Sequence, residues 1–289
     1  MTLLVTGGRG RLGTDLLAAA ARAGVGPVRA PGSAELDVTD AVAVRAAVRT
    51  LDRGSVVLNA AAYTAVDAAE TDAQRAHAVN AQGPAQLAAA CAEHGVSLVH
   101  VSTDYVFAGD APRPYRADDP TGPRSVYGRT KLAGETAVLA AGGHVVRTAW
   151  LYGAHGPNFV RTMARLERTR DTVTVVDDQR GSPTWTADLA DGLIALACAL
   201  DRVPPGVLHC VNAGATTWCG FARAVFTELG ADPARVLACT TAEFPRPAPR
   251  PANSVLDTAS WAAAGLPPLR DWRAALSAAV TTHGPQLRS

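Results

Sequence analysis

A tyrosine and a lysine four residues apart are the first pair in this sequence whose types could do chemistry together. Lys131 is the only lysine among the 27 Lys and Arg residues, and it follows Tyr127 in the run Tyr-Gly-Arg-Thr-Lys. On a helix the two side chains share one face, so the ammonium can stabilise the phenolate and lower the phenol pKa from its usual value of about 10. A phenol adjusted in this way is a general acid. Exposed residue pairs on ordinary helices show the same spacing. The Tyr–Lys pair therefore indicates catalysis only together with other features of the chain.

A glycine-rich run at the amino terminus provides a second chemical signal. Residues 6–13 read Thr-Gly-Gly-Arg-Gly-Arg-Leu-Gly, which contains Gly-x-Gly-x-x-Gly and directly follows an apolar run at residues 3–6. Such glycines allow a tight turn and a close approach of the backbone, and the free N–H groups at the start of the following helix attract anions. The run therefore predicts a site for a dinucleotide pyrophosphate.

The identity of the dinucleotide depends on the end of the second strand. A site for NAD usually has an acid about 20 residues after the glycines, where it binds the ribose 2′-hydroxyl. Here the chain reads Val28-Arg29-Ala30-Pro31. A guanidinium at Arg29 can pair with a 2′-phosphate, so the sequence favours NADPH. NADH stays open, because Arg29 is equally compatible with an ordinary surface position.

Strands and helices in alternation must position these groups. We expect strands at residues 3–6, near 28, and at 55–58, 97–102 and 144–148, with helices at 12–24, 40–51, 71–94 and 124–141. This alternation is typical of right-handed crossovers on a parallel sheet. The predicted fold class is α/β, a Rossmann-type doubly wound parallel sheet with a smaller C-terminal α/β substrate-binding region.

The alternation loosens after Trp150. Helices are expected at 158–168, 186–200, 221–229 and 272–280, and strands at 172–176 and 207–211. We therefore expect an NAD(P)-binding domain at residues 1–150. Residues 151–289 would be mainly a nucleotide-sugar-binding region, with some segments returning to the Rossmann core. The proline-rich run at 244–251 fits either an interdomain linker or a loop laid over a ligand, because proline excludes helix and central strand.

Composition excludes several classes of protein. A formal charge of +1, with 27 basic and 26 acidic residues spread along the chain, argues against a nucleic-acid surface. No apolar run reaches the roughly 18 residues that a membrane span needs, and the start lacks the pattern of a signal peptide, so we expect a cytoplasmic protein. The five cysteines lack paired spacing, which argues against disulfides and a zinc site.

Several segments together resemble a known family. The segments 6–13, 37–38, 59–67, 101–107, 127–131 and 147–150 occur in the order seen in extended short-chain dehydrogenases. Residues 178–184 (Asp-Gln-Arg-Gly-Ser-Pro-Thr) and 250–254 (Arg-Pro-Ala-Asn-Ser) narrow the match. The chain resembles the dTDP-4-dehydrorhamnose reductase family over nearly its whole length.

The resemblance implies a catalytic set. Tyr127 would protonate the oxygen of a 4-keto group while the nicotinamide delivers hydride to the carbon. Lys131 would lower the Tyr127 pKa and hold the nicotinamide ribose, and Thr103 would hydrogen-bond the carbonyl oxygen.

The resemblance also implies binding residues. Besides Tyr127, Lys131 and Arg29, those implied for the cofactor are Gly7, Gly10, Arg11, Leu12, Gly13, Asp37, Val38, Ala60, Ala61 and Ala62. Besides Thr103, those implied for the substrate are Asp104, Trp150, Arg250 and Asn253. No metal ligands are assigned. Some family members dimerise around magnesium, which leaves a homodimer open, but Asp15 and Asp188 at the comparable places are shorter than glutamate.

The implied activity is NAD(P)H-dependent reduction of the 4-keto group of a dTDP-4-keto-6-deoxyhexose. The default reaction converts dTDP-4-dehydro-L-rhamnose to dTDP-L-rhamnose, and the exact sugar stays open. The alternatives are a non-catalytic regulatory binding protein of the same fold and a nucleotide-sugar epimerase or dehydratase. A dehydratase would need a glutamate after Asp104, where this chain has Tyr105.

Overall fold

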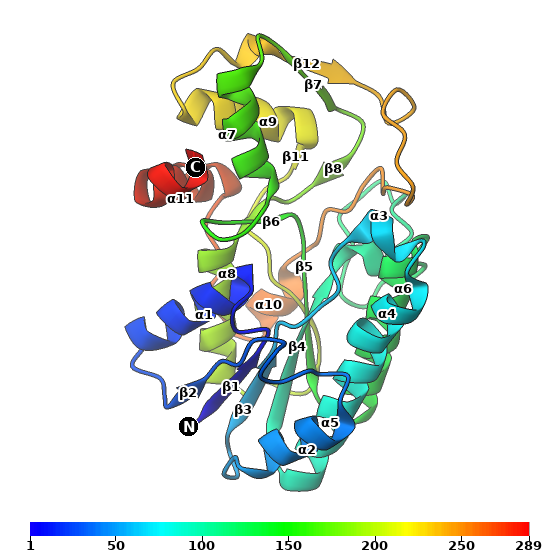
Figure 1. Ribbon diagram of the computed structural model, residues 1–289, viewed down its shortest axis with the longest axis vertical. Coiled ribbons are helices and arrows are strands. Elements are labelled where there is room, and N and C mark those ends of the chain that lie inside the picture. The colour runs from blue at the N-terminus through cyan, green and yellow to red at the C-terminus, as the bar shows by residue number, and fades with distance from the viewer. Residues whose placement is uncertain (289) are drawn as a thin grey trace.

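Six parallel strands form the central sheet of this computed structural model, which describes residues 1–288 (Figure 1). In spatial order they are β10 (Gly206–His209), β5 (His144–Thr148), β4 (Ser97–Thr103), β3 (Val56–Asn59), β1 (Leu3–Thr6) and β2 (Val28–Arg29). Every neighbouring pair is parallel. The strand order reverses between β1 and β3, and ligands of such sheets bind outside the strand ends at this point. The predicted fold class is confirmed.

Helices cover both faces of the sheet (Figure 1). One face carries α1 (Arg11–Arg22) and α8 (Thr186–Ala197), and the other carries α2 (Ala41–Arg49), α5 (Gly83–His94) and α6 (Val126–Ala140). Alternate residues of one strand supply the two cores: Leu3 and Val5 join the first, and Leu4 joins the second. This burial on both faces explains why the strands read as continuous apolar runs.

The helix expected over residues 71–94 is present as one unbroken helical run from Ala73 to His94, with a π-turn inside it that the sequence did not predict. The structure has α3 (Val66–Ala69), α4 (Ala73–His77), a π-helical turn η1 (Ala78–Gln82) and then α5. Inside the π-turn, the fully buried Asn80 accepts a hydrogen bond from the Tyr63 N–H and donates to the Tyr63 carbonyl and to Thr130 Oγ1. The turn therefore ties the segment after β3 to α6, and such turns are frequent near functional sites.

A separate core lies in the C-terminal part, which occupies the upper half of Figure 1. It includes Tyr152, Phe221, Phe226 and Trp272. Its helices are α7 (Phe159–Thr169), α9 (Trp218–Glu228) and α11 (Trp272–Arg288), beside the parallel pair β7 (Val173–Val176) and β12 (Val236–Cys239). Short pairs join β6 (Leu151–Tyr152) to β9 (Thr184–Trp185) and β8 (Arg180–Gly181) to β11 (Thr216–Thr217). The remaining short elements are η2 (Asp104–Val106), η3 (Pro233–Arg235) and α10 (Ala259–Ala263).

The C-terminal half does not stay apart from the first domain. Helix α8 packs against α1, β10 extends the central sheet, and α10 contacts β10. Within residues 1–288, no helix has both the length and the apolar character that crossing a membrane requires.

The proline-rich run at 244–251 lies against the first domain. Asp67 of α3 binds this run through both carboxylate oxygens. One oxygen pairs with Arg250 at 2.8 Å and accepts a hydrogen bond from the Ala248 N–H at 3.2 Å, and the other lies 3.5 Å from Arg246. Of the two interpretations open from the sequence, these contacts favour the loop, because a free linker would not be held to α3.

A buried ion pair fixes α6 to the sheet. Arg147 of β5 donates to both carboxylate oxygens of Glu135 at 2.7–3.2 Å, and the two side chains are 4% and 1% exposed. The guanidinium also donates to the Ala117 carbonyl and lies over the Phe107 ring. Removing one partner would leave the other charged and buried, which is far more costly than losing an exposed pair.

We therefore expect Glu135→Ala to lower the free energy of unfolding by about 3–5 kcal/mol. The matched control is Asp191→Ala, which removes the partner of Arg22 in a pair that is half exposed, and it should cost less than about 1 kcal/mol. Urea denaturation followed by circular dichroism measures both. Equal costs for the two variants would contradict the structural role given to the buried pair.

Candidate active site

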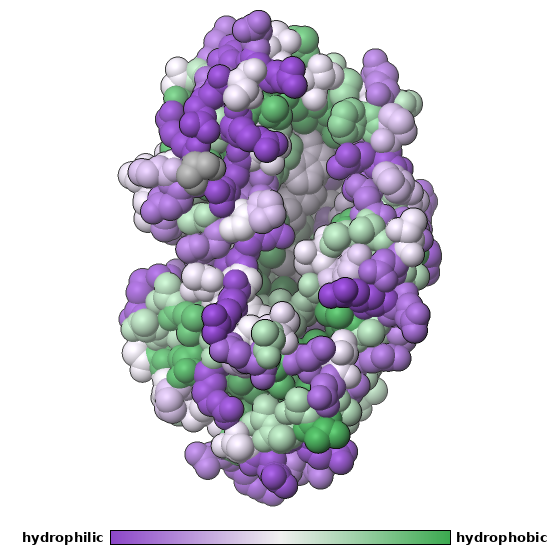
Figure 2. Space-filling view, in the orientation of Figure 1, coloured by the Kyte–Doolittle hydropathy of each residue, from purple (hydrophilic) through white to green (hydrophobic). Residues whose placement is uncertain are grey.

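A cavity of about 610 Å³ opens at the carboxyl ends of β1 and β3, where the strand order reverses. The molecular surface is hollowed where the two parts of the chain meet (Figure 2). Seven of the predicted cofactor residues line the cavity: Gly7, Gly10, Asp37, Val38, Ala60, Ala61 and Ala62. Volumes of this size are typical of small-molecule and cofactor sites.

The glycine run makes this cavity possible. Gly7 has φ of +69°, and a Cβ there would lie 2.9 Å from the Ala61 backbone, so only glycine fits between the two loops. A Cβ on Gly13 would lie 2.3 Å from the Gly7 carbonyl oxygen. Gly10 caps α1 without a side-chain hydrogen bond, so the first N–H groups of the helix have no capping partner. They are suited to bind an anion such as a pyrophosphate.

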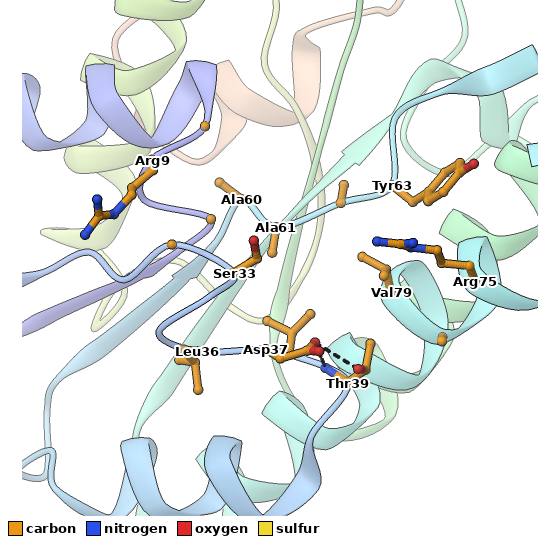
Figure 3. Close-up of a pocket in the computed structure, with 16 residues that line it drawn as sticks. Arg9, Ser33, Leu36, Asp37, Thr39, Ala60, Ala61, Tyr63, Arg75 and Val79 are labelled. Atoms are coloured by element: carbon orange, nitrogen blue, oxygen red, sulfur yellow. Dashed lines mark hydrogen bonds between the residues drawn. The ribbon is translucent and has the colours of Figure 1, made fainter. Parts of the chain in front are cut away.

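The arginine beside the cavity differs from the one that the sequence suggested. Arg29 donates to Thr50 Oγ1 at 2.5 Å and does not line the cavity. Arg9 and Arg75 line it from opposite sides, with Ser33 between them and the Asp37 carboxylate bonded to Thr39 (Figure 3). Arg9 pairs with Glu35, and this contact lowers the pKa of the Glu35 carboxyl. The sequence suggested Arg29 because this residue lies at the end of the second strand. It could not suggest Arg9, because the sequence does not show in which direction a loop side chain points.

Three predicted cofactor residues of the glycine run lie outside the cavity lining: Arg11, Leu12 and Gly13. Leu12 packs in the sheet core. Arg11 donates to the Pro157 carbonyl at 2.7 Å, burial lowers the pKa of its guanidinium, and its charge acts on Tyr127. The structure thus places Arg11 between the start of α1 and the tyrosine, on the side of the C-terminal part.

Tyr127 and Lys131 lie on α6, whose first turn is capped by the Ser125 hydroxyl accepting from the Gly128 N–H. Both are buried. Burial raises the pKa of Tyr127 to about 12 and the Asp104 charge adds to the rise, while a hydrogen bond with Thr103 and the charge of Arg11 oppose it. The expected lowering of the Tyr127 pKa is not found, because desolvation outweighs the favourable contacts and Lys131 points its Nζ elsewhere.

Thr103 and Asp104 meet Tyr127 at the end of β4. The Thr103 hydroxyl donates to one Asp104 carboxylate oxygen at 2.9 Å and accepts from the Tyr105 N–H. The other Asp104 oxygen is buried without a hydrogen bond among the described residues. Burial raises the pKa of Asp104 to about 6, and the hydrogen bond from Thr103 opposes this rise. Thr103, Asp104 and Tyr127 do not line the large cavity, but Tyr63 of its lining packs against the cluster that contains Tyr127. Shifted pKa values near a cavity are typical of catalytic sites.

The side chain of Lys131 is held by residues of the central sheet. Its Nζ donates to the Val101 carbonyl at 2.7 Å and lies 3.1 Å from His100 Nε2, and Asn59 contacts the other ring nitrogen at 2.9 Å. Sequence reasoning missed both His100 and Asn59 as partners of the lysine. Asn59 begins the family segment 59–67, and His100 directly precedes the family segment 101–107. Their contact with each other arises from the pairing of β3 with β4, which the sequence does not show.

The predicted substrate residues already have protein partners. Trp150 has φ of +49° and stacks on Trp218 with ring centroids 3.6 Å apart, and the Gly181 backbone packs against the same indole. Arg250 is paired with Asp67. Burial and the Asp104 charge raise the pKa of Tyr105, and the charge of Arg250 opposes that rise. The Asn253 amide donates to the carbonyls of Ala111 and Arg113, so it fixes the loop around residues 109–113.

The two acids considered for magnesium are engaged separately. Asp188 accepts from Asn212 at 2.7 Å and pairs with Arg270 at 3.0 Å, whereas Asp15 lies 3.9 Å from His155. No group of three His, Cys, Asp or Glu side chains within residues 1–288 is arranged to hold a metal ion.

Known proteins resemble this chain over nearly its full length. Residues 1–284 match the family described as RmlD substrate binding domain. The dTDP-4-dehydrorhamnose reductase of Streptomyces griseus is 56% identical over 279 residues, which cover 95% of this chain and 91% of that protein. A Streptomyces antibioticus protein described as a probable dTDP-4,6-dihydroxy-2-methyloxan-3-one 4-ketoreductase is 52% identical over 281 residues, covering 96% of this chain and 93% of that protein.

A solved structure agrees with the sequence matches. The dTDP-4-dehydrorhamnose reductase of Bacillus anthracis in complex with NADP superposes with a TM-score of 0.92 at 33% identity, and the match covers 98% of this chain and 100% of that one. The match thus includes both the sheet and the C-terminal part. The chain belongs to the dTDP-4-dehydrorhamnose reductase family of extended short-chain dehydrogenases and is an oxidoreductase.

Proposed function

We propose that the protein reduces the 4-keto group of a dTDP-4-keto-6-deoxyhexose, with hydride from NADPH and the proton from Tyr127. The observation that carries this proposal is the meeting of Tyr127, Thr103 and Asp104 at the end of β4, next to a glycine-lined cavity at the reversal of strand order. The names of the relatives support the class of substrate. Our default reaction is dTDP-4-dehydro-L-rhamnose to dTDP-L-rhamnose.

The cavity fits a nicotinamide dinucleotide. The free N–H groups at the start of α1 would bind the pyrophosphate, Asp37 and Val38 would flank the adenine, and residues 60–62 would flank the ribose and phosphate. Arg9 is the better candidate than Arg29 for the 2′-phosphate of NADPH, because it lines the cavity. The bound cofactor supplies the hydride. The Bacillus anthracis relative was solved with NADP, which supports the same choice here.

The protein's own groups would handle the proton. A phenol with a pKa of about 12 is fully protonated at neutral pH, so Tyr127 enters the reaction able to donate. Thr103 would turn its hydroxyl from Asp104 to the carbonyl oxygen of the sugar, where it stabilises the charge that develops. Lys131 would hold the nicotinamide ribose. The presence of all three residues supports a catalytic role over a regulatory binding role. A dehydratase would need a glutamate after Asp104, where this chain has Tyr105.

The dTDP part of the substrate would bind beside the proline-rich loop. Its diphosphate would compete with Asp67 for Arg250, because a dianion offers the guanidinium the same bidentate contact. Trp150 would contact the sugar with the part of its indole that Trp218 leaves open. Asn253 would act by holding loop 109–113 in place, since its amide protons are already donated. The related ketoreductase from Streptomyces antibioticus makes another 4-keto sugar the second candidate substrate.

The assignment is tested by following oxidation of NADPH and NADH at the nicotinamide absorbance, with enzymatically prepared dTDP-4-dehydro-L-rhamnose. We expect oxidation with NADPH faster than with NADH. A panel of other dTDP-4-keto sugars measures selectivity. Cofactor binding without oxidation of any of these sugars would contradict the proposed reaction and favour the regulatory binding protein.

Replacing Tyr127 with phenylalanine removes the proton donor and leaves the cavity lining intact. We expect Tyr127→Phe to lower kcat by about 10²–10⁴-fold while the Kd for NADPH changes little. The matched control is Tyr152→Phe, because the buried Tyr152 hydroxyl has no hydrogen bond among the described residues. The control should keep its turnover. Full activity in the Tyr127 variant would remove the tyrosine from the mechanism.

Replacing Arg9 tests the cofactor side of the cavity. We expect Arg9→Ala to raise KM for NADPH about tenfold and to leave KM for NADH nearly unchanged, because only NADPH carries the 2′-phosphate. Arg29→Ala is the matched control and should change neither value, since Arg29 contacts Thr50 outside the cavity. If steady-state kinetics showed a raised KM for NADPH in Arg29→Ala and not in Arg9→Ala, Arg29 would be the residue that binds the 2′-phosphate.

A further inference from the structure

A continuous chain of buried hydrogen bonds leads from the cavity wall to Lys131. The Ala61 N–H donates to Asn59 Oδ1 at 3.2 Å, and Thr6 Oγ1 donates to the same oxygen at 2.7 Å. Asn59 Nδ2 lies 2.9 Å from His100 Nδ1, and His100 Nε2 lies 3.1 Å from Lys131 Nζ. Asn59 and His100 are fully buried and Lys131 is 1% exposed, so this chain is largely shielded from solvent.

The backbone fixes the direction of this chain. A backbone N–H can only donate, so the Asn59 oxygen must face Ala61 and the Asn59 amide nitrogen must face His100. That nitrogen donates to His100 Nδ1, which therefore carries no proton. A neutral histidine then carries its proton on Nε2, and the geometry directs this N–H at Lys131 Nζ.

An ammonium conflicts with that direction. The charged form of lysine has three donors and no acceptor, so it would bring one of its N–H bonds against the His100 N–H. A neutral amine has a lone pair, accepts the proton of His100 and still donates to the Val101 carbonyl at 2.7 Å. Every bond in the chain is satisfied only when Lys131 is neutral. A protonated His100 would add a second conflict, with the Asn59 amide.

We propose that His100 is a positioning residue that holds Lys131 as a neutral amine in the cofactor-free protein at alkaline pH, and that binding of NADPH there converts this amine to an ammonium. The proposal rests on the proposed function for the place of the cofactor. The proton comes from solvent, and the only bond that forms is the new N–H of Lys131. The ribose hydroxyl oxygens and the negative charge of the cofactor favour the ammonium, which then gives up the bond from His100 and keeps the one to Val101.

The surrounding charges agree with this assignment. Burial lowers the pKa of Lys131 to about 8, although the Glu135 carboxylate raises it, and Arg147 pairs with that carboxylate. Burial lowers the pKa of His100 well below its usual value, and a charge on Lys131 would lower it further, so the imidazole is neutral with either form of the lysine. Other ionisable groups on elements packed against α6 contribute nothing to the Lys131 shift: Asp67, Arg75, His77, Glu93 and Asp104.

The sign of the pH dependence follows. Above a pKa of about 8 the cofactor-free protein has a neutral Lys131, whereas the complex keeps the ammonium to higher pH. Binding of NADPH near pH 9 therefore takes up a proton, and affinity falls as pH rises through this range.

The chain offers an unusually direct test, because Lys131 is its only lysine. Labelling lysine with ¹³C at Cε and ¹⁵N at Nζ gives one side-chain signal whose shift against pH reports this charge alone. We expect a midpoint below about 9 in the cofactor-free protein, against about 10.4 for a free side chain, and a midpoint at least one pH unit higher with NADPH bound. A cofactor-free midpoint of about 9 or above would overturn the proposal.

Two variants separate His100 from burial. In His100→Asn the amide oxygen takes the place of Nδ1 and keeps the bond from Asn59 but leaves nothing at Nζ. In His100→Gln the amide oxygen takes the place of Nε2 and accepts from an ammonium. Both should raise the midpoint by about one pH unit or more, a tenfold gain in proton affinity. His144→Asn is the control, because this buried histidine bonds the Val203 carbonyl, and it should leave the midpoint unchanged.

Calorimetry in two buffers of different ionisation enthalpy completes the test by counting protons taken up with NADPH at pH 9. We expect an uptake in the parent protein and its loss in His100→Gln. Unchanged midpoints in both His100 variants would reduce His100 to a structural role. Binding of NADPH without proton uptake would contradict this inference alone, whereas no binding of NADPH would contradict the proposed cofactor site.

Discussion

The close approach of two backbones at the end of β1 is the constraint on which the rest of the site depends. Gly7 lies against Ala61 with no room for a side chain, and this contact holds the glycine loop beside the segment after β3. The start of α1, the cavity and the polar chain from Asn59 to Lys131 all follow from that juxtaposition. A cofactor bound here would have its phosphates at a helix start and its nicotinamide directed toward α6.

Buried polar groups then hold α6 in register with the sheet. Three contacts join α6 to its neighbours at different positions along the helix: Asn80 with Thr130, His100 with Lys131, and Arg147 with Glu135. A buried polar group is costly unless it is paired, so these contacts specify one position of the helix. The same burial sets the chemistry, because it raises the Tyr127 pKa and lowers the Lys131 pKa. Packing and the pKa values of these two side chains are thus linked in one region.

Local structure could be predicted from the sequence, whereas partners across the fold could not. The bounds of β1 and β5 and the Asp40 cap of α2 follow from short-range patterns, and the structure confirms them. The π-turn around Asn80, the exchange of Arg29 for Arg9 beside the cavity, and the bond between Lys131 and His100 depend on which loops and strands become neighbours. Periodicity does not encode such side-chain directions, so the sequence placed Lys131 beside Tyr127 and missed its actual partners.

The most direct test of the proposed reaction is to follow the hydrogen itself. NADPH carrying deuterium at both hydrogen positions of the nicotinamide C4 would be reacted with dTDP-4-dehydro-L-rhamnose, and the product examined by NMR. Our account predicts deuterium bound to C4 of the sugar, with the new hydroxyl proton drawn from solvent through Tyr127. A product without deuterium, or with deuterium at another carbon, would contradict hydride transfer to the 4-keto group.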